Sequence, residues 1–194
     1  MSDKPRILIF AGSTRKDSYN KRLAKAAAAA SQAAGAEVTL IDLADFPMPL
    51  YDQDLEAQSG LSEHARRFQD LMRSHQGFAI ASPEYNSSIT GVLKNALDWA
   101  SRSRPEEPLV AFRGKIAALL SASPGNLGGL RSLVTLRSIL SNIGVFVLPD
   151  QLAIPRAHEA FNETHALKDA KQQAALERLT RQLIEVTTRL APTS

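Results

Sequence analysis

RILIFAGSTRKDSYN, residues 6–20, contains the transition that sets the architecture of this chain. Residues Arg6–Ala11 are mostly apolar and predict a strand buried on both faces. A loop of small and hydroxyl-bearing residues follows. The sequence from about Ser18 to Ala34 then predicts a helix, with Gly35 where a C-terminal cap belongs. A strand that passes through a short loop into a helix is the repeating unit of a parallel α/β sheet.

The same succession recurs along the chain. Further apolar runs predict strands at Glu37–Asp42, Gly77–Ser82, Lys115–Ala122 and Val145–Leu148. Further helices are predicted at Ser62–Ser74, Gly91–Ala100, Gly129–Ile143 and Lys168–Leu190. Five such alternations predict a three-layer α/β sandwich, a parallel sheet with helices on both faces. Right-handed crossovers leave few topologies, and five strands fit the flavodoxin-like order 2-1-3-4-5.

Two segments stand outside this alternation. Leu43–Gly60 has two prolines and no clear period, and it is too long for a simple connector. Loops of this length are often functional or contact a partner. Pro105–Pro108 is predicted to be a plain surface turn.

The composition excludes several classes of protein. With 194 residues and 44% hydrophobic residues, residues 1–194 are expected to form a single domain with a sizeable core. The absence of cysteine excludes disulfide scaffolds, thiolate metal sites and cysteine nucleophiles. A net charge of +3 is too small to indicate a nucleic-acid partner.

Location and metal content are also expectations from the sequence. The N-terminus shows no signal-peptide pattern, and no apolar run approaches the roughly 18 residues that a membrane helix requires. We therefore expect a cytoplasmic protein without a membrane span. The four histidines have no partners at the spacing of a metal site, so no metal is expected.

The loop after the first strand is suited to a phosphate group. A helix N-terminus offers backbone N–H groups and the positive end of a dipole, and small residues allow close approach. Hydroxyls and amides add neutral donors, and Arg15 adds a planar fork that matches phosphate oxygens. Neither a G-x-G-x-x-G nor a G-x-x-x-x-G-K-[ST] motif is present, which favours a mononucleotide such as FMN. Alternatively, Ser18 or Asp17 simply caps the helix and Arg15 is solvated.

The loop after the third strand, SPEYNSSITG at residues 82–91, can accept a flat heteroaromatic ring. Tyr85 offers an aromatic face, Pro83 stiffens the entry, and the backbone N–H groups from Glu84 to Ser87 could meet polar ring atoms. The alternative is an ordinary polar turn before the next helix. In that helix Leu97 and Trp99 are expected in the core. Lys94 and Asp98 are one turn apart and could form an ion pair or a subunit contact.

The loop after the fourth strand, SASPGNLGG at residues 121–129, contains three glycines and a proline. Its backbone can approach a ligand closely, and the hydroxyls of Ser121 and Ser123 could bond to it. A flexible connector explains the same residues equally well. Its expected position beside the other two loops favours a binding role, because ligands of doubly wound sheets bind beyond the carboxyl ends of the strands.

Together these segments resemble the NADPH-dependent FMN reductase family, which includes bacterial quinone, chromate and azo-dye reductases of flavodoxin-like fold. The matching segments are GSTRKDSYN at 12–20, SPEYNSSITGVLKNALDW at 82–99 and SASPGNLGGLRSL at 121–133. They span about the first three-quarters of the chain.

The resemblance implies a set of cofactor-binding residues. By this comparison the FMN phosphate would be held by Ser13, Arg15, Ser18 and Asn20. The isoalloxazine ring would be lined, mostly through backbone atoms, by Pro83, Glu84, Tyr85 and Asn86, and closed on the other side by Ser121, Ser123 and Gly125. Members of the family are commonly homodimers and often homotetramers with the flavin near the subunit boundary, which makes Leu43–Gly60 a candidate partner surface.

The resemblance also implies an activity. We expect a ping-pong cycle in which NAD(P)H passes a hydride to N5 of FMN and the flavin then reduces a quinone or a similar small acceptor, with no catalytic side chain. The alternatives are a flavodoxin-like electron carrier, a non-flavin scaffold domain, and a reductase that supplies reduced FMN to a monooxygenase. Shuttle flavodoxins tend to be strongly acidic, whereas this chain is net positive.

Overall fold

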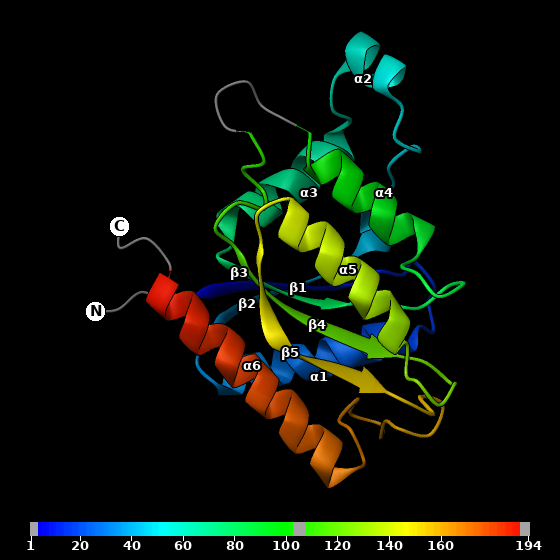
Figure 1. Cartoon of the computed structure of the whole chain (residues 1–194), viewed down its shortest axis with the longest axis vertical. Coiled ribbons are helices and arrows are strands. Elements are labelled where there is room, and N and C mark those ends of the chain that lie inside the picture. Colours follow the sequence, from blue (N-terminus) through cyan, green and yellow to red (C-terminus); the bar gives the residue numbers. More distant parts are fainter. Residues whose placement is uncertain (1–3, 103–107, 191–194) are drawn as a thin grey trace.

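The computed structural model describes residues 4–102 and 108–190, and its centre is a five-stranded parallel sheet (Figure 1). The strands are β1 (Arg6–Ala11), β2 (Glu37–Asp42), β3 (Gly77–Ala81), β4 (Ile116–Ala122) and β5 (Phe146–Ile154). Their order is β2-β1-β3-β4-β5, which confirms the predicted 2-1-3-4-5 arrangement. Strand order reverses between β1 and β3, and a ligand crevice is expected there.

Helices cover both faces of the sheet, as Figure 1 shows. The long helices are α1 (Tyr19–Ala33), α3 (Glu63–Ser74), α4 (Gly91–Ala100), α5 (Leu130–Asn142) and α6 (Ala170–Leu190). One apolar cluster joins α1 and α6 to the sheet, and a second joins α3, α4 and α5 to its other face. No helix in the described part of the chain has the length and apolar character needed to cross a bilayer.

The helix ends follow the sequence signals. Gly35 has a φ of +96° just after α1, and the N–H of Ala36 bonds to the carbonyl of Ser31. This pair of features is the Schellman end that the glycine predicted. Ser62 caps α3 through a hydrogen bond from the N–H of Ala65. Leu97 and Trp99 are buried in the core, as expected.

Two elements differ from expectation. β5 continues to Ile154, beyond the predicted Leu148. Its register against β4 shifts between Ala117 and Leu119 of β4, and the strand pairs again with β4 after this irregularity. The segment after β2 contains a short 3₁₀ helix at Leu43–Asp45 and an additional helix, α2 (Gln53–Ser59). Of the turn predicted at Pro105–Pro108, residues 105–107 lie outside the described residues.

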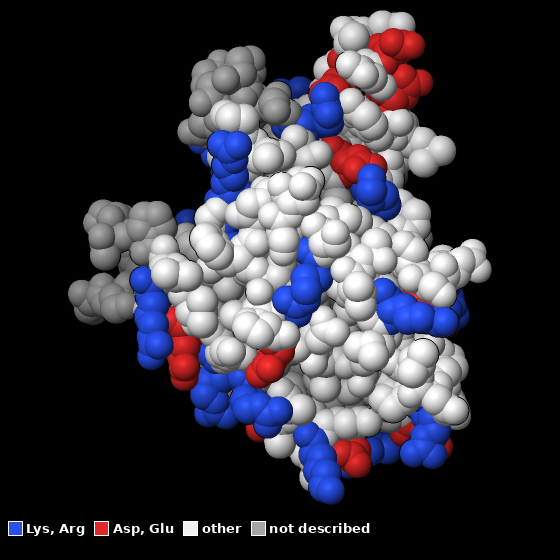
Figure 2. Space-filling model, in the orientation of Figure 1, with Lys and Arg blue, Asp and Glu red and all other residues white. Residues whose placement is uncertain are grey.

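We call residues 47–60 the arm, and its helix α2 stands away from the body of the molecule. Figure 1 shows α2 projecting at the top, and Figure 2 shows acidic side chains gathered there. None of the α2 residues is buried. A helix of seven residues is not stable by itself in water, so its neighbours in the arm must hold it.

The central strands bring three loops to one edge. β1, β3 and β4 are buried along almost their whole length, as expected for strands covered on both faces. In the register of the sheet Ala11 lies opposite Ala81, and Ala81 lies opposite Leu120. The chain therefore leaves β1, β3 and β4 at neighbouring points. We call the following segments loop 1 (residues 12–18), loop 2 (82–90) and loop 3 (123–129).

Candidate functional site

Backbone hydrogen bonds extend the sheet into the three loops. The N–H of Gly12 donates to the carbonyl of Ala81 at 2.9 Å, and the N–H of Ser82 donates to the carbonyl of Leu120 at 2.8 Å. Gly12 also packs tightly, because an added Cβ would lie 2.8 Å from the Leu93 side chain. Loops 1 and 2 therefore begin from fixed positions.

Thr90 joins loop 2 to loop 1. Its buried hydroxyl donates to the carbonyl of Gly12 at 2.6 Å and accepts from the N–H of Leu93 at 3.1 Å. The same oxygen thus caps α4 and ties its N-terminus to the other loop. Thr90 was not among the residues predicted for the site, although a threonine directly before the helical run at Gly91 is an N-cap signal.

Asn20 joins α1 to the end of β4. Its Nδ2 donates to the carbonyl of Ala122 at 2.8 Å, and its Oδ1 accepts from the Ala122 N–H at 2.9 Å. The side chain is 3% exposed. Asn20 was predicted to contact a phosphate, but its amide is paired on both sides with the backbone. The structure therefore shows Asn20 holding the start of α1 against the end of β4.

A cluster of buried hydroxyls surrounds the start of loop 2. The carbonyl of Ser82 accepts from the hydroxyl of Ser121 at 2.7 Å and from that of Ser132 at 3.3 Å. All three serines are fully buried. The predicted residue Ser121 therefore uses its hydroxyl within the protein, where an unpaired buried group would be costly. Ser132 was missed because a serine one turn into a helix has no distinctive sequence signal.

Loop 3 depends on two adjacent glycines. Gly128 and Gly129 have φ values of +61° and +87°. A Cβ on Gly128 would lie 2.6 Å from the backbone of Ile154, and one on Gly129 would lie 2.0 Å from the Ser121 hydroxyl. Only glycine satisfies both the conformation and the space here. The other predicted residues of this region, Ser123 and Gly125, are half-buried and exposed respectively.

The N-terminus of α1 lacks a side-chain cap. Ser18 is at the N-cap position with an extended backbone, but its hydroxyl accepts no hydrogen bond from the helix. Both Ser18 and Ser13 are buried, 5% and 4% exposed. Ser13 accepts from the N–H of Arg15 at 3.2 Å, while Arg15 itself is exposed and forms no ion pair within residues 4–102 and 108–190. The simple capping alternative for Ser18 is thus not what the structure shows.

Loop 2 turns sharply at its tip. The backbones of Tyr85 and Ser88 exchange two hydrogen bonds of 3.0 Å, and Asn86 and Ser87 between them have positive φ values of 50° and 66°. This geometry matches a type I′ turn. The Tyr85 side chain is 51% exposed, so its face is available for stacking. The backbone N–H of Tyr85 donates to Ser88 within this turn, so it is not free to contact a ring, contrary to expectation.

Glu84 links loop 2 to α5. Its carboxylate accepts from the backbone N–H of Arg131 at 3.0 Å and pairs with the Arg131 guanidinium, whose Nη2 lies at 2.6 Å. The Glu84 side chain is 9% exposed. An acidic group at a helix N-terminus is favourable, so this contact stabilises the start of α5, which has no other side-chain cap. Pro83, next to it, is buried.

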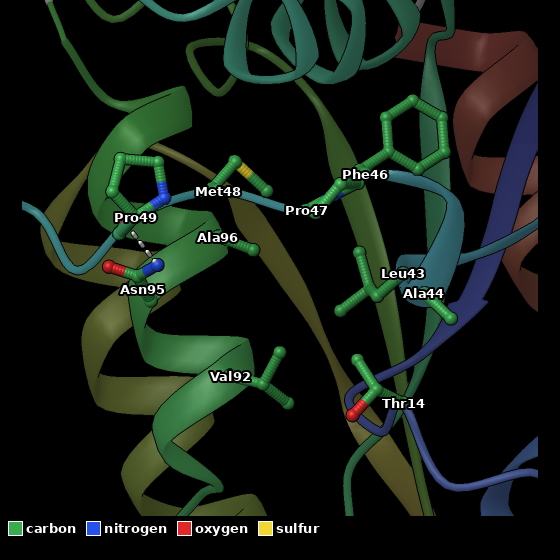
Figure 3. Close-up of a pocket in the computed structure, with 10 residues that line it drawn as sticks. All are labelled: Thr14, Leu43, Ala44, Phe46, Pro47, Met48, Pro49, Val92, Asn95 and Ala96. Carbon is green, nitrogen blue, oxygen red and sulfur yellow. Dashed lines mark hydrogen bonds between the residues drawn. The ribbon is translucent and has the colours of Figure 1, made fainter.

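A pocket of about 520 Å³ lies beside loop 1 (Figure 3). It lies between loop 1, the segment after β2 and α4, and its walls are mainly apolar. Its lining residues are Thr14, Leu43, Ala44, Phe46, Pro47, Met48, Pro49, Val92, Asn95 and Ala96. Figure 3 shows Thr14 of loop 1 facing Val92 of α4 across the pocket. None of these lining residues was among the predicted site residues.

Comparison with known proteins identifies the family. The family model described as NADPH-dependent FMN reductase matches residues 5–159, which include all three loops. The chain belongs to this family. It is therefore an oxidoreductase with FMN as its flavin and NADPH or NADH as the electron donor.

Individual relatives agree with the family assignment. An NAD(P)H-dependent FMN reductase of Pseudomonas aeruginosa is 39% identical over 181 residues, covering 91% of this chain and 92% of the relative. A quinone reductase of Escherichia coli K12 is 35% identical over 148 residues, covering 76% of each. Among solved structures, a flavoenzyme NAD(P)H:(acceptor) oxidoreductase from Paracoccus denitrificans superimposes with a TM-score of 0.82 at 26% identity, covering 96% of this chain and 98% of that one.

The residues at the three loops fit a flavin of this family. The uncapped N-terminus of α1, two buried hydroxyls and an unpaired arginine suit a phosphate dianion. In loop 2, the N–H groups of Glu84, Asn86 and Ser87 have no hydrogen-bond partner among the described residues, so they can meet polar ring edges. Of the predicted residues of loop 3, Gly125 is exposed and Ser123 is half-buried, so both can be reached by a ligand.

Proposed function

We propose that this protein is an FMN-dependent NAD(P)H oxidoreductase that reduces a quinone or a similar acceptor, such as a flavin, azo dye or chromate, by two electrons in a ping-pong cycle. The observation that carries the proposal is the uncapped N-terminus of α1, held beside loops 2 and 3 by Thr90 and Asn20. The quinone reductase relative supports a small-molecule acceptor of this type.

In the proposed complex the flavin phosphate binds at loop 1. Ser13 and Ser18 present hydroxyls from buried positions, and Arg15 is free to close over the phosphate from solvent. Asn20 acts indirectly, because its amide fixes α1 to Ala122 and so fixes the direction of the helix N-terminus. A charge-assisted hydrogen bond from arginine to phosphate is among the stronger polar contacts available to a protein.

The ring binds between loops 2 and 3 in this proposal. Tyr85 offers its exposed face, while Pro83, Glu84 and Asn86 contribute backbone atoms from a turn that the Tyr85–Ser88 hydrogen bonds hold rigid. Ser123 and Gly125 close the other side. Ser121 has an indirect role, because its hydroxyl donates to the Ser82 carbonyl and so fixes the start of loop 2.

Bound FMN would supply the redox chemistry, accepting a hydride at N5 from NAD(P)H and returning two electrons to the acceptor. The protein supplies binding, orientation and a fixed backbone, and no catalytic side chain is needed.

We further propose that residues 1–194 form one flavin-binding domain, that the protein is cytoplasmic, where NAD(P)H is supplied, and that it forms a homodimer or homotetramer.

The test is a visible absorption spectrum of the purified protein after FMN addition, followed by NADPH under anaerobic conditions and then by a quinone. The proposal expects bound flavin, rapid bleaching by NADPH and recovery of the flavin band with quinone. A protein that binds FMN but is not bleached by either nicotinamide would be an electron carrier. If bleaching occurs but the reduced flavin is released into solution, the protein would be a supplier of reduced FMN. Failure to bind FMN would overturn the proposal.

A further inference from the structure

The segment that joins β5 to α6 (Figure 1) contains a tight turn at residues 161–167. Phe161 and Leu167, at its two ends, pair with each other as an isolated antiparallel bridge. Both side chains are buried in the apolar cluster that joins α1 and α6 to the sheet. The turn therefore begins and ends in the core, and only its middle is exposed to solvent.

Asn162 holds this turn in one shape. Its Oδ1 accepts from the backbone N–H groups of Thr164 and Ala166, at 3.0 and 2.9 Å, and from the Thr164 hydroxyl at 2.9 Å. Its carbonyl accepts from the N–H of His165 at 3.1 Å. His165 has a φ of +67°, which is uncommon for a residue with a side chain, although histidine and asparagine adopt it more readily than most. The backbone therefore gives the His165 ring a defined position.

The His165 ring lies beside two basic side chains of α1. The Nζ of Lys25 is 3.4 Å from Nε2 of His165. The guanidinium of Arg22, one turn earlier in α1, lies 5.8 Å from the centre of the Tyr19 ring, a contact that restricts its position. Burial, together with the positive charges of Lys25 and Arg22, lowers the pKa of His165. We call Arg22, Lys25 and His165 the basic cluster.

No acidic side chain within residues 4–102 and 108–190 forms an ion pair with the basic cluster. The helix that carries two of its members, α1, has no acidic residue between Tyr19 and Ala33. Positive charges held close together repel each other, and an anion bound between them would turn this repulsion into attraction. The cluster thus combines fixed donors, excess positive charge and access from solvent, which are the properties of an anion site.

A phosphate monoester is the anion that matches these donors best. The ammonium, the guanidinium and an imidazole N–H can donate to different oxygens of one phosphate, and the planar guanidinium suits two oxygens at once. A dianion compensates two positive charges, whereas a carboxylate compensates one. A bound dianion would also favour the protonated form of the His165 ring, which has a donor on both nitrogens.

The basic cluster lies near the proposed flavin site. Because a helix rises about 1.5 Å per residue, Arg22 and Lys25 are about 6 and 10 Å along α1 from Ser18 at its N-cap. The segment that leads to the turn is also bonded to loop 3, since the N–H of Ala157 donates to the carbonyl of Ser123 at 3.1 Å. An elongated molecule with one end at the flavin can therefore place a phosphate at the cluster.

We propose that Arg22, Lys25 and His165 bind a dianionic phosphate monoester. Two sources have this chemistry: the 2′-phosphate of NADPH, bound while its nicotinamide is at the flavin, and the phosphate of a separate small molecule. The first source would give the protein a preference for NADPH over NADH. The inference rests on the proposed function only in naming NADPH, because the cluster can bind phosphate whether or not the flavin reacts.

An NMR titration of the FMN-loaded protein with inorganic phosphate tests the site for either source. Bound FMN occupies loop 1, so the added phosphate is not drawn there. The ring signals of His165 are identified by their loss in H165N, a change that suits the left-handed backbone. We expect these signals to shift saturably, with a dissociation constant at least about tenfold larger in K25M. The control K4M removes an exposed lysine before β1 and should titrate like the unmodified protein.

Steady-state kinetics with NADPH and NADH separate the two sources. If NADPH supplies the phosphate, K25M and H165N should each raise the KM for NADPH at least about tenfold and leave the KM for NADH unchanged. If K25M weakens phosphate binding while neither variant changes the ratio of the two KM values, the site stands and its ligand is a separate molecule.

The titration also shows which idea has failed. Absence of a saturable shift at His165, or equal phosphate affinity in K25M and the unmodified protein, would overturn the inference. Failure to bind FMN would overturn the proposed function instead, and the phosphate titration of His165 would still decide whether the basic cluster binds phosphate.

Discussion

Loop 1 and the arm both follow strands at the same edge of the sheet, yet they are held in different ways. Loop 1 is tied down by buried groups, the Thr90 hydroxyl and the Asn20 amide. The outer part of the arm is tied by half-exposed groups, with Glu56 of α2 accepting from Tyr51 at 2.9 Å and from Arg102 at 2.9 and 3.0 Å. The difference indicates that loop 1 is shaped before any ligand binds, whereas the contacts of α2 in the arm remain within reach of water.

Two glycines with positive φ values give the strongest test of this comparison. Gly128 in loop 3 and Gly60 in the arm have φ values of +61° and +68°. A Cβ at Gly128 would meet the Ile154 backbone, whereas one at Gly60 would meet nothing within 4 Å. G128A should lower the free energy of unfolding by about 3 kcal/mol or more, because the added methyl group would collide with backbone atoms. G60A should lower it by about 1–2 kcal/mol, because the Gly60 backbone, with φ +68° and ψ −162°, is one that only glycine adopts readily, although no collision is added. Urea unfolding measures both, and equal losses would contradict the close packing of loop 3.

Two asparagines provide a second test of the same contrast. Asn20 and Asn95 each form two hydrogen bonds to backbone groups of another segment, but Asn20 is buried and Asn95 is half-buried. N20A leaves both Ala122 backbone groups unpaired and should cost about 3 kcal/mol of stability, with weaker FMN binding. N95A should cost about 1 kcal/mol, because water can reach the freed groups. Comparable FMN affinity in N20A and the unmodified protein would remove the positioning role given to Asn20.

The smallest expected effect is a pH dependence confined to the arm. Burial alone would raise the pKa of the Glu56 carboxyl, but hydrogen bonds from Arg102 and Tyr51 bring it below its ordinary value of 4.5. A carboxyl with a lowered pKa contributes stability above its unfolded pKa and loses it as the pH falls through the folded one. Below about pH 4.5 the arm should therefore loosen.

Trp99, the single tryptophan of the chain, reports this change. Its ring contacts Tyr51 of the arm with centroids 5.1 Å apart. Its fluorescence should change on acidification in the unmodified protein, and the part due to Glu56 should be absent in E56Q. Identical acid titrations of the two proteins would show that Glu56 does not hold the arm.

Much of the fold could be predicted because its strands are short apolar runs. β1 and β2 have the predicted bounds, and the helix ends coincide with Ser62 and Gly35. The far end of β5 was missed because Pro149 and Asp150 interrupt its apolar run, although the edge of a sheet tolerates both. α2 was missed because no residue in it is buried, so it has no apolar period, although Asp52 before it and Gly60 after it are the usual boundary signals.

The sequence predicted that the three loops lie together, but it did not reveal which of their polar groups form hydrogen bonds within the protein. The pairing of Asn20 with Ala122, and of Ser121 with Ser82, joins residues far apart in the chain, and local pattern cannot show such contacts. The ion pair of Glu84 with Arg131 was missed for the same reason. Residue types therefore predicted a candidate site, while only the structure separates the residues whose polar groups are paired within the protein from those whose groups are unpaired.

The most direct test of the account is a comparison of FMN with riboflavin, which has the same ring but no phosphate, by isothermal titration calorimetry. If loop 1 holds the phosphate, riboflavin should bind at least about 100-fold more weakly than FMN, a difference of about 2.7 kcal/mol. R15A should weaken FMN binding and leave riboflavin binding unchanged. Equal affinities for FMN and riboflavin in the unmodified protein would contradict the central claim that the N-terminus of α1 is a phosphate site.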